Sequence, residues 1–256
     1  MNKTNKIKVK SNEYTANLPK DFKQPTDTVG RRLLKEYGAL FVARGGAIPP
    51  KKVIFKSERE VSSFQASLSK SIKTVGSFEI ELQTAAMKAL KKAVIAAEQN
   101  CLTITPRGAD AAKRNYADTV ALWKSRVNPA LAHWVEKGNL EPAEASKISR
   151  LSPFDQVVEV FNLESQGMFC SKDLLKSIIY SVAPPGTSQH LSLLALDVNE
   201  HNDPSVRDVL SEHGWFQTVV SDLPHFTFLG VLENQLPNLG LKKVSDNKRT
   251  FWLPNL

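Results

Sequence analysis

The stretch SQHLSLLALD, residues 188–197, poses the main question about the fold of this chain. Five apolar residues and one Ser separate His190 from Asp197, so an imidazole and a carboxylate close the two ends of an apolar segment. Residues 193–198 predict a strand that is apolar on both faces. A carboxylate in such a strand is costly unless a cation or several hydrogen bonds neutralise it. The sequence therefore predicts a positive partner beside Asp197.

His190 can be that partner only if it leaves the strand. Seven positions of extended chain span roughly 23 Å, and residues an odd number apart point to opposite faces. The preceding residues 184–188, PPGTS, favour an irregular turn. We therefore expect His190 to lie on that turn and to fold back over Asp197. An arginine or backbone donors at a turn would neutralise Asp197 as well.

A second histidine, His225, begins the pattern HFTF, which predicts another strand, and Asp222 lies three residues before it. Catalytic zinc takes three protein ligands from His, Asp, Glu or Cys and leaves a fourth position for water. A carboxylate beside such a site, not itself a ligand, can act as a base. Asp222 is thus a candidate base, although an Asp that starts a turn and a core His would give the same pattern. The other histidines are expected in a helix or in polar turns, away from the site: His133, His201 and His213.

The order of helical and strand patterns along the chain indicates an α+β fold. Residues 82–100 carry apolar side chains at helical spacing, and Pro129 should interrupt the long helix that follows them. Helices are expected at residues 82–100, 109–137, 154–166, 171–182 and 204–214, and strands at 101–105, 193–198, 215–220, 225–232 and 250–253.

The length, composition and net charge indicate how many domains the chain can form and which surroundings it favours. With 256 residues, 41% of them hydrophobic, the chain can form one large domain, or a domain with an appendage. We expect a basic, partly structured arm over residues 1–75 and the main domain over 76–256. The net charge of +8 favours anionic surroundings such as cell-wall polymer, nucleic acid or acidic lipid. No signal peptide is visible, and no run of about 18 apolar residues predicts a membrane span.

The two cysteines, Cys101 and Cys170, stand far apart and form no CxxC motif. This spacing excludes a cysteine zinc site or a redox motif. One disulfide between them or two free thiols are both compatible with the sequence.

Taken together, these residues resemble the zinc D-alanyl-D-alanine peptidase family, which shares its fold with lysostaphin and the sonic hedgehog signalling domain. The family pattern is S-x-H, a strand of small residues ending in Asp, and a carboxylate three residues before a final His. The matching residues here are Ser188 to His190, Ala195 with Asp197, and Asp222 with His225. The match covers about residues 80–232. It implies an α+β fold in which helices pack on a small antiparallel sheet that carries the zinc site.

The resemblance also implies a role for each residue. Zinc would be held by His190, Asp197 and His225. Asp222 would be the base, and Ser188 would help to orient the substrate. Members of the family have an arginine that contacts the substrate. Arg114, in the Arg-Asn-Tyr match at 114–116, is the preferred candidate for this role. The alternative is Arg107, which follows the strand predicted at 101–105.

The function that the resemblance implies is a zinc metallopeptidase acting on peptidoglycan stem peptides, as a D-alanyl-D-alanine carboxypeptidase. The alternatives are a wall endopeptidase that cuts between L-Ala and D-Glu, and a zinc-containing wall-binding domain without catalysis. The partner would be a wall peptide rather than nucleic acid, the protein a monomer, and its place the periplasm or the cell wall. Two residues depart from the family pattern, Leu193 where Gly is usual and Asp222 where carboxypeptidases carry Glu.

Overall fold

The computed structural model describes residues 13–246 and 249–256, so the first twelve residues of the basic arm lie outside the described part. The helices and 3-10 turns are α1 (Glu13–Asn17), α2 (Thr28–Tyr37), η1 (Gly38–Val42), α3 (Glu58–Ala66), α4 (Thr84–Gln99), α5 (Tyr116–Glu136), α6 (Pro142–Ser149), α7 (Pro153–Ser165), η2 (Ile178–Tyr180), η3 (Gln189–Ser192), α8 (Pro204–Glu212), η4 (Glu233–Gln235) and η5 (Pro237–Leu239). The strands are β1 (Lys70–Val75), β2 (Phe78–Gln83), β3 (Ala195–Asp197), β4 (Trp215–Phe216), β5 (His225–Phe228), β6 (Leu241–Asp246) and β7 (Arg249–Pro254).

The strands form small antiparallel sheets, and together with the helices they give the α+β organisation that the sequence predicts. β1 pairs with β2 and β6 pairs with β7 as hairpins. β5 pairs with β3 on one side and with β4 on the other, which makes β5 the central strand of a three-stranded sheet. This sheet carries two of the candidate zinc ligands.

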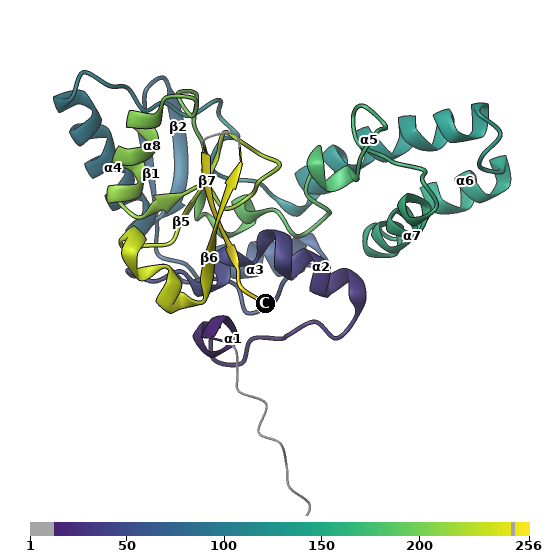
Figure 1. The fold of residues 1–256 in the computed structure, drawn as a ribbon, viewed down its shortest axis with the longest axis horizontal. Coiled ribbons are helices and arrows are strands. Elements are labelled where there is room, and N and C mark those ends of the chain that lie inside the picture. The colour runs from purple at the N-terminus through teal and green to yellow at the C-terminus, as the bar shows by residue number, and fades with distance from the viewer. Residues whose placement is uncertain (1–12, 247–248) are drawn as a thin grey trace, which may run out of the picture.

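Helices lie on two sides of these sheets (Figure 1). α4 and α8 contact each other on one side, and α4 also packs on the β1–β2 hairpin. The buried residues of α4 recur at helical spacing and confirm the helix predicted at 82–100: Ala86, Met87, Leu90, Ala93 and Ala97. α5, α6 and α7 stand on the other side and project away from the sheets. Within residues 13–246 and 249–256, no helix is both long and apolar enough to cross a bilayer.

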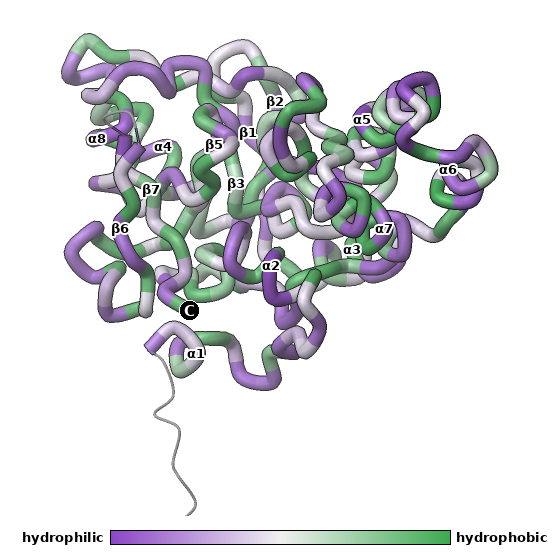
Figure 2. Tube along the Cα trace, turned by 45° about the vertical axis from the view of Figure 1, so that its right-hand side comes forward, coloured by the Kyte–Doolittle hydropathy of each residue, from purple (hydrophilic) through white to green (hydrophobic). Residues whose placement is uncertain are grey.

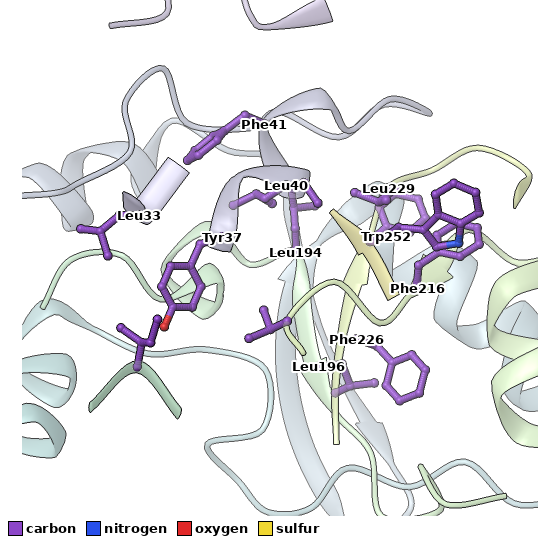
Figure 3. Close-up of a cluster of buried hydrophobic side chains, with 14 of the residues drawn as sticks. Leu33, Tyr37, Leu40, Phe41, Leu194, Leu196, Phe216, Phe226, Leu229 and Trp252 are labelled. Carbon is purple, nitrogen blue, oxygen red and sulfur yellow. The ribbon is translucent and has the colours of Figure 1, made fainter. Parts of the chain in front are cut away.

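One hydrophobic cluster joins the three-stranded sheet to the elements around it (Figure 3). Leu196 of β3, Phe226 of β5 and Phe216 of β4 are all at most 3% exposed. Burying a side chain of this kind stabilises the fold by about 1.5–3 kcal/mol. Figure 2 shows the corresponding pattern along the chain, with hydrophilic residues concentrated on the outer turns and helices. The sheet is therefore fixed firmly enough to position a site at its edge.

The N-terminal segment contributes to the same core. Leu33 and Tyr37 of α2 and Phe41 of η1 are buried in the cluster that contains Leu194 and Leu196. The boundary predicted at residue 75 falls between the two strands of the β1–β2 hairpin. The division into an arm and a catalytic domain stays a prediction, but the described part of residues 1–75 is packed against the rest.

The predicted interruption at Pro129 is wrong, because α5 continues through it to Glu136. Proline cannot donate to the carbonyl four residues earlier, here that of Ser125. This carbonyl lies on an exposed part of the helix and accepts from Arg126 Nη1 at 3.5 Å. On the opposite face, buried Trp123, Val127 and Leu131 hold the helix against the core.

Two further elements differ from the prediction. Residues 171–182 form turns and η2 instead of a helix, because side chains take the backbone N–H groups: Glu164 accepts from Ile178 N at 2.6 Å, and Asp173 accepts from Leu175 N at 3.2 Å. Residues 101–105 form no strand, since the Thr105 N–H donates to the carboxylate of Glu200 at 2.8 Å instead of to a neighbouring strand.

Candidate metal centre

Strand pairing brings Asp197 and His225 together. In the antiparallel register of β3 and β5, Asp197 lies directly opposite His225. Side chains at directly opposed positions of such a pair lie on the same face of the sheet. The distance between His225 Nδ1 and Asp197 Oδ1 is 3.2 Å.

His190 reaches the same point from a turn before β3, as the sequence predicts. It lies in η3, and the chain then reverses at Leu193, which has a left-handed backbone (φ 58°, ψ 30°) and donates its N–H to the His190 carbonyl. Gln83 of β2 fastens this turn: its backbone N–H donates to the Leu193 carbonyl at 3.0 Å, and its side chain donates to the Ser192 carbonyl at 2.8 Å.

Leu193, which stands where the resembled family usually has Gly, adopts the left-handed backbone that favours glycine. A left-handed conformation costs an ordinary residue roughly 1–2 kcal/mol, and glycine avoids that cost. The Leu193 side chain is fully buried and does not line the cavity beside His190. Its bulk therefore lies in the protein interior and not where a substrate would pass.

Three ligand atoms form a nearly equilateral triangle. His190 Nε2, His225 Nδ1 and Asp197 Oδ1 are separated by 3.2, 3.2 and 3.3 Å. Ligand atoms on tetrahedral zinc, at about 2.0–2.1 Å from the metal, lie about 3.3–3.4 Å from one another. The two imidazoles are 1% and 4% exposed. These residues can hold a metal ion with little movement.

The protonation states also fit a cation. Burial alone would raise the pKa of Asp197, but the charges and hydrogen bonds of His190 and His225 outweigh it and hold that pKa well below its usual range. Burial lowers the pKa of His190, which favours the neutral ring, against the opposing effect of Asp197. An ionised Asp197 and a His190 ring that favours its neutral form then face one another, and a cation between them would suit both.

Gln189 fixes the orientation of His225. Its Oε1 lies 2.9 Å from His225 Nε2, while its amide nitrogen donates to the Tyr37 carbonyl at 3.0 Å. The hydroxyl of Thr227 also donates to Gln189 Oε1. Because Oε1 only accepts, the proton of the neutral His225 ring belongs on Nε2, and the Nδ1 lone pair faces the triangle. Partners of this kind commonly set the tautomer of a metal-bound histidine.

A cavity of about 200 Å³ opens beside the triangle. His190 and His225 form part of its wall, and three of the other predicted site residues, Ser188, Asp222 and Arg114, line it too. Asp222 is exposed and Ser188 is buried. The structure thus brings the predicted base into the wall of the same cavity as the two predicted histidine ligands.

The two candidate arginines lie in different places. Arg114 is half-buried, lines the cavity and lies 3.4 Å from Asp197 Oδ2 through Nη2, so it contacts the carboxylate oxygen that faces away from the triangle. Its Nε is buried without a hydrogen-bond partner. Arg107 is exposed and does not line the cavity; its backbone N–H donates to the Asp197 carbonyl. The geometry favours Arg114.

Among the lining residues that had no role in the sequence interpretation are Gln189, Tyr37 and Arg126. Gln189 is the middle residue of the S-x-H motif, so its position next to His190 could have indicated that it belongs to the site. Tyr37 is buried, which raises the pKa of its phenol far above the usual value, so this cavity wall carries a neutral hydroxyl. Nothing in the local sequence connects it with His225.

Comparison with known proteins adds one structural likeness. No family model matches the chain, and no curated protein sequence matches it. Among solved structures the chain is similar to a mutant of the vancomycin-resistance D,D-pentapeptidase VanY from a VanB-type cassette, in complex with Zn(II). The identity is 14%, the match covers 64% of this chain and 82% of that one, and the TM-score is 0.34. A likeness this weak carries no argument about fold or function, which must rest on the residues themselves.

Proposed function

We propose that this protein is a zinc metallopeptidase that hydrolyses peptidoglycan stem peptides, as a D-alanyl-D-alanine carboxypeptidase. The observation that carries the proposal is the triangle of His190, Asp197 and His225 at the edge of a cavity that also contains the carboxylate of Asp222. The family resemblance of the motif supports the choice of zinc and of the wall peptide. The net charge of +8 suits an anionic wall, which would place the protein in the periplasm or at the cell wall.

The residues divide the chemistry between them. A zinc ion held by His190, Asp197 and His225 would lower the pKa of its water and polarise a peptide carbonyl. Asp222, exposed in the cavity, would accept a proton from the attacking water and pass it to the leaving amine. Arg114 keeps the Asp197 carboxylate oriented through Oδ2, and its guanidinium, which lines the cavity, can donate to the oxygen of the scissile carbonyl.

Metal analysis of the purified protein and a peptide assay test this proposal together. We expect one zinc per chain by mass spectrometry, and release of D-alanine from a synthetic stem pentapeptide. Asp222→Asn should lower kcat by about 10²–10⁴-fold, the usual contribution of a positioned acid–base group. Asp208→Asn, an exposed carboxylate of α8 away from the cavity, is the matched control and should leave kcat unchanged.

The possible outcomes separate the alternatives. Products of digested wall fragments, identified by mass spectrometry, distinguish loss of the terminal D-alanine from cleavage between L-Ala and D-Glu. Bound zinc without hydrolysis of any wall peptide would instead indicate a binding domain without catalysis. Absence of bindable zinc would refute all of these readings.

A further inference from the structure

Arg126 is the charged group of the cavity that the proposed chemistry leaves unused. It lies on α5 one helical turn after Leu122, and both residues line the cavity that contains His190 and His225. A guanidinium is always ionised in a protein, so this half-buried side chain carries a full positive charge into the wall.

The hydrogen bonds of Arg126 are incomplete. Among the residues that the structure describes, its buried Nε has no partner, and its Nη1 donates only to the preceding residue, to Ser125 Oγ at 3.0 Å and to the Ser125 carbonyl at 3.5 Å. Among the ion pairs of residues 13–246 and 249–256, none involves Arg126. Arg114, by contrast, has Asp197. A guanidinium carries five N–H donors, and within the described residues that of Arg126 bonds only to Ser125, so donors of its Nη atoms are left for a ligand.

A second cavity, of about 520 Å³, continues from the first. The two share Arg126, Tyr180 and Ser181, and the second is also bounded by Lys172 and Lys176. The acid in its wall, Asp173, lies 3.7 Å from Lys176 and offsets one of the two lysines. The second cavity therefore carries more positive than negative side chains, whereas the first also contains the carboxylate of Asp222.

We infer that Arg126 binds a carboxylate of an acidic peptide substrate in a groove running from the metal triangle to Lys172 and Lys176. The planar fork of arginine matches a carboxylate, and the Nη atoms of Arg126, of which Nη2 makes no hydrogen bond to the described residues, are the donors that such a pair can use. The inference rests on the proposed function, because it assumes that a peptide occupies the cavity. The carboxylate can come from the peptide C-terminus or from an acidic side chain.

Calorimetric titration of zinc-loaded Asp222→Asn protein, in which cleavage should be slow enough to measure binding, tests the inference. The probes are a stem pentapeptide with all its carboxylates, its C-terminal amide, and its analogue with Gln in place of Glu. Adding Arg126→Gln should weaken binding of the first peptide by about 10- to 100-fold, the range for a hydrogen bond to a charged group. For the analogue that lacks the carboxylate bound by Arg126, Arg126→Gln should not weaken binding further. The analogue that behaves in this way identifies the source of the carboxylate.

Two variants serve as controls. Arg126→Lys, which keeps the charge and loses the fork, should weaken binding less than Arg126→Gln. Arg150→Gln removes an exposed arginine of the α6 end, remote from the cavity walls, and should change nothing. Equal weakening for all three peptides, or none, would overturn the role of Arg126 while leaving the proposed function intact. Failure of the parent protein to bind any of them would reject the proposed function as well.

Discussion

Replacing Gln189 with Leu should weaken zinc binding without removing a ligand. The substitution keeps a side chain of similar size but deletes the acceptor of His225 Nε2–H and the donor to the Tyr37 carbonyl. The His225 proton is then free to move to Nδ1, the nitrogen that faces the triangle. Loss of such an orienting partner typically costs 10- to 100-fold in metal affinity, or about 1.4–2.7 kcal/mol.

Stability must be separated from affinity, because the same change leaves polar groups buried. Each unpartnered donor or acceptor costs about 1–3 kcal/mol of folding free energy. Gln156 provides a matched control: it is equally buried, accepts from the Trp123 ring N–H at 2.9 Å and donates to the Ile148 carbonyl at 3.0 Å. Gln156→Leu should therefore lower the free energy of unfolding by a similar amount and leave zinc affinity unchanged.

The assay is competition for zinc against a chromophoric chelator of known affinity, with urea unfolding of the metal-free proteins in parallel. Cobalt substitution gives a second readout, since its visible absorption reports the ligand geometry directly. If Gln189→Leu holds zinc as tightly as the wild type, or if Gln156→Leu weakens it equally, then Gln189 does not set the state of His225.

The remaining predictions concern the metal, the turn and the thiols. Zinc at 100 times its Kd should raise the free energy of unfolding by about 2.7 kcal/mol in the wild type and not in His225→Ala, measured by urea titration with and without a chelator. Leu193→Gly should be more stable than Leu193→Ala by about 1 kcal/mol, because glycine alone relieves the left-handed backbone; the opposite order in urea would show that the turn is unstrained. Exposed Cys101 should react quickly with a thiol reagent at pH 8, whereas Cys170 should react only as the protein unfolds. Burial, followed by the charge of Glu164, raises the pKa of Cys170 to about 12, so raising the pH from 7 to 9 should not make it reactive in the folded protein.

The candidate ligands were accessible from the sequence because each follows a local rule. An acid in an apolar strand requires a cation, and a turn of Pro, Gly, Thr and Ser before His190 allows that residue to fold back. The strand patterns around Asp197 and His225 also correspond to real strands, β3 and β5, whose pairing closes the triangle. The roles assigned to the individual site residues stay predictions.

Other features depend on contacts that a local pattern cannot contain. The helical pattern at 171–182 is overridden by Glu164, a residue of the preceding helix whose carboxylate takes a backbone N–H. Pro129 remains inside α5 because the Ser125 carbonyl, to which proline has no N–H to donate, lies on the exposed side of the helix. The Gln189 side chain is held by a hydrogen bond to the backbone carbonyl of Tyr37. Every residue has a backbone carbonyl, so the sequence gives no sign of which one accepts this bond.

The bond between Gln189 and Tyr37 has a consequence for how the protein folds. It joins residues 152 positions apart, and the bond from Gln83 to Ser192 spans 109. Contacts of such separation require the closure of long loops and form slowly. The segment before residue 84 is synthesised before the turn at His190, yet it completes its contacts only when that turn has been made. We therefore expect the metal centre to become ordered late in folding, so that zinc added to a refolding chain stabilises the product without accelerating the first phase.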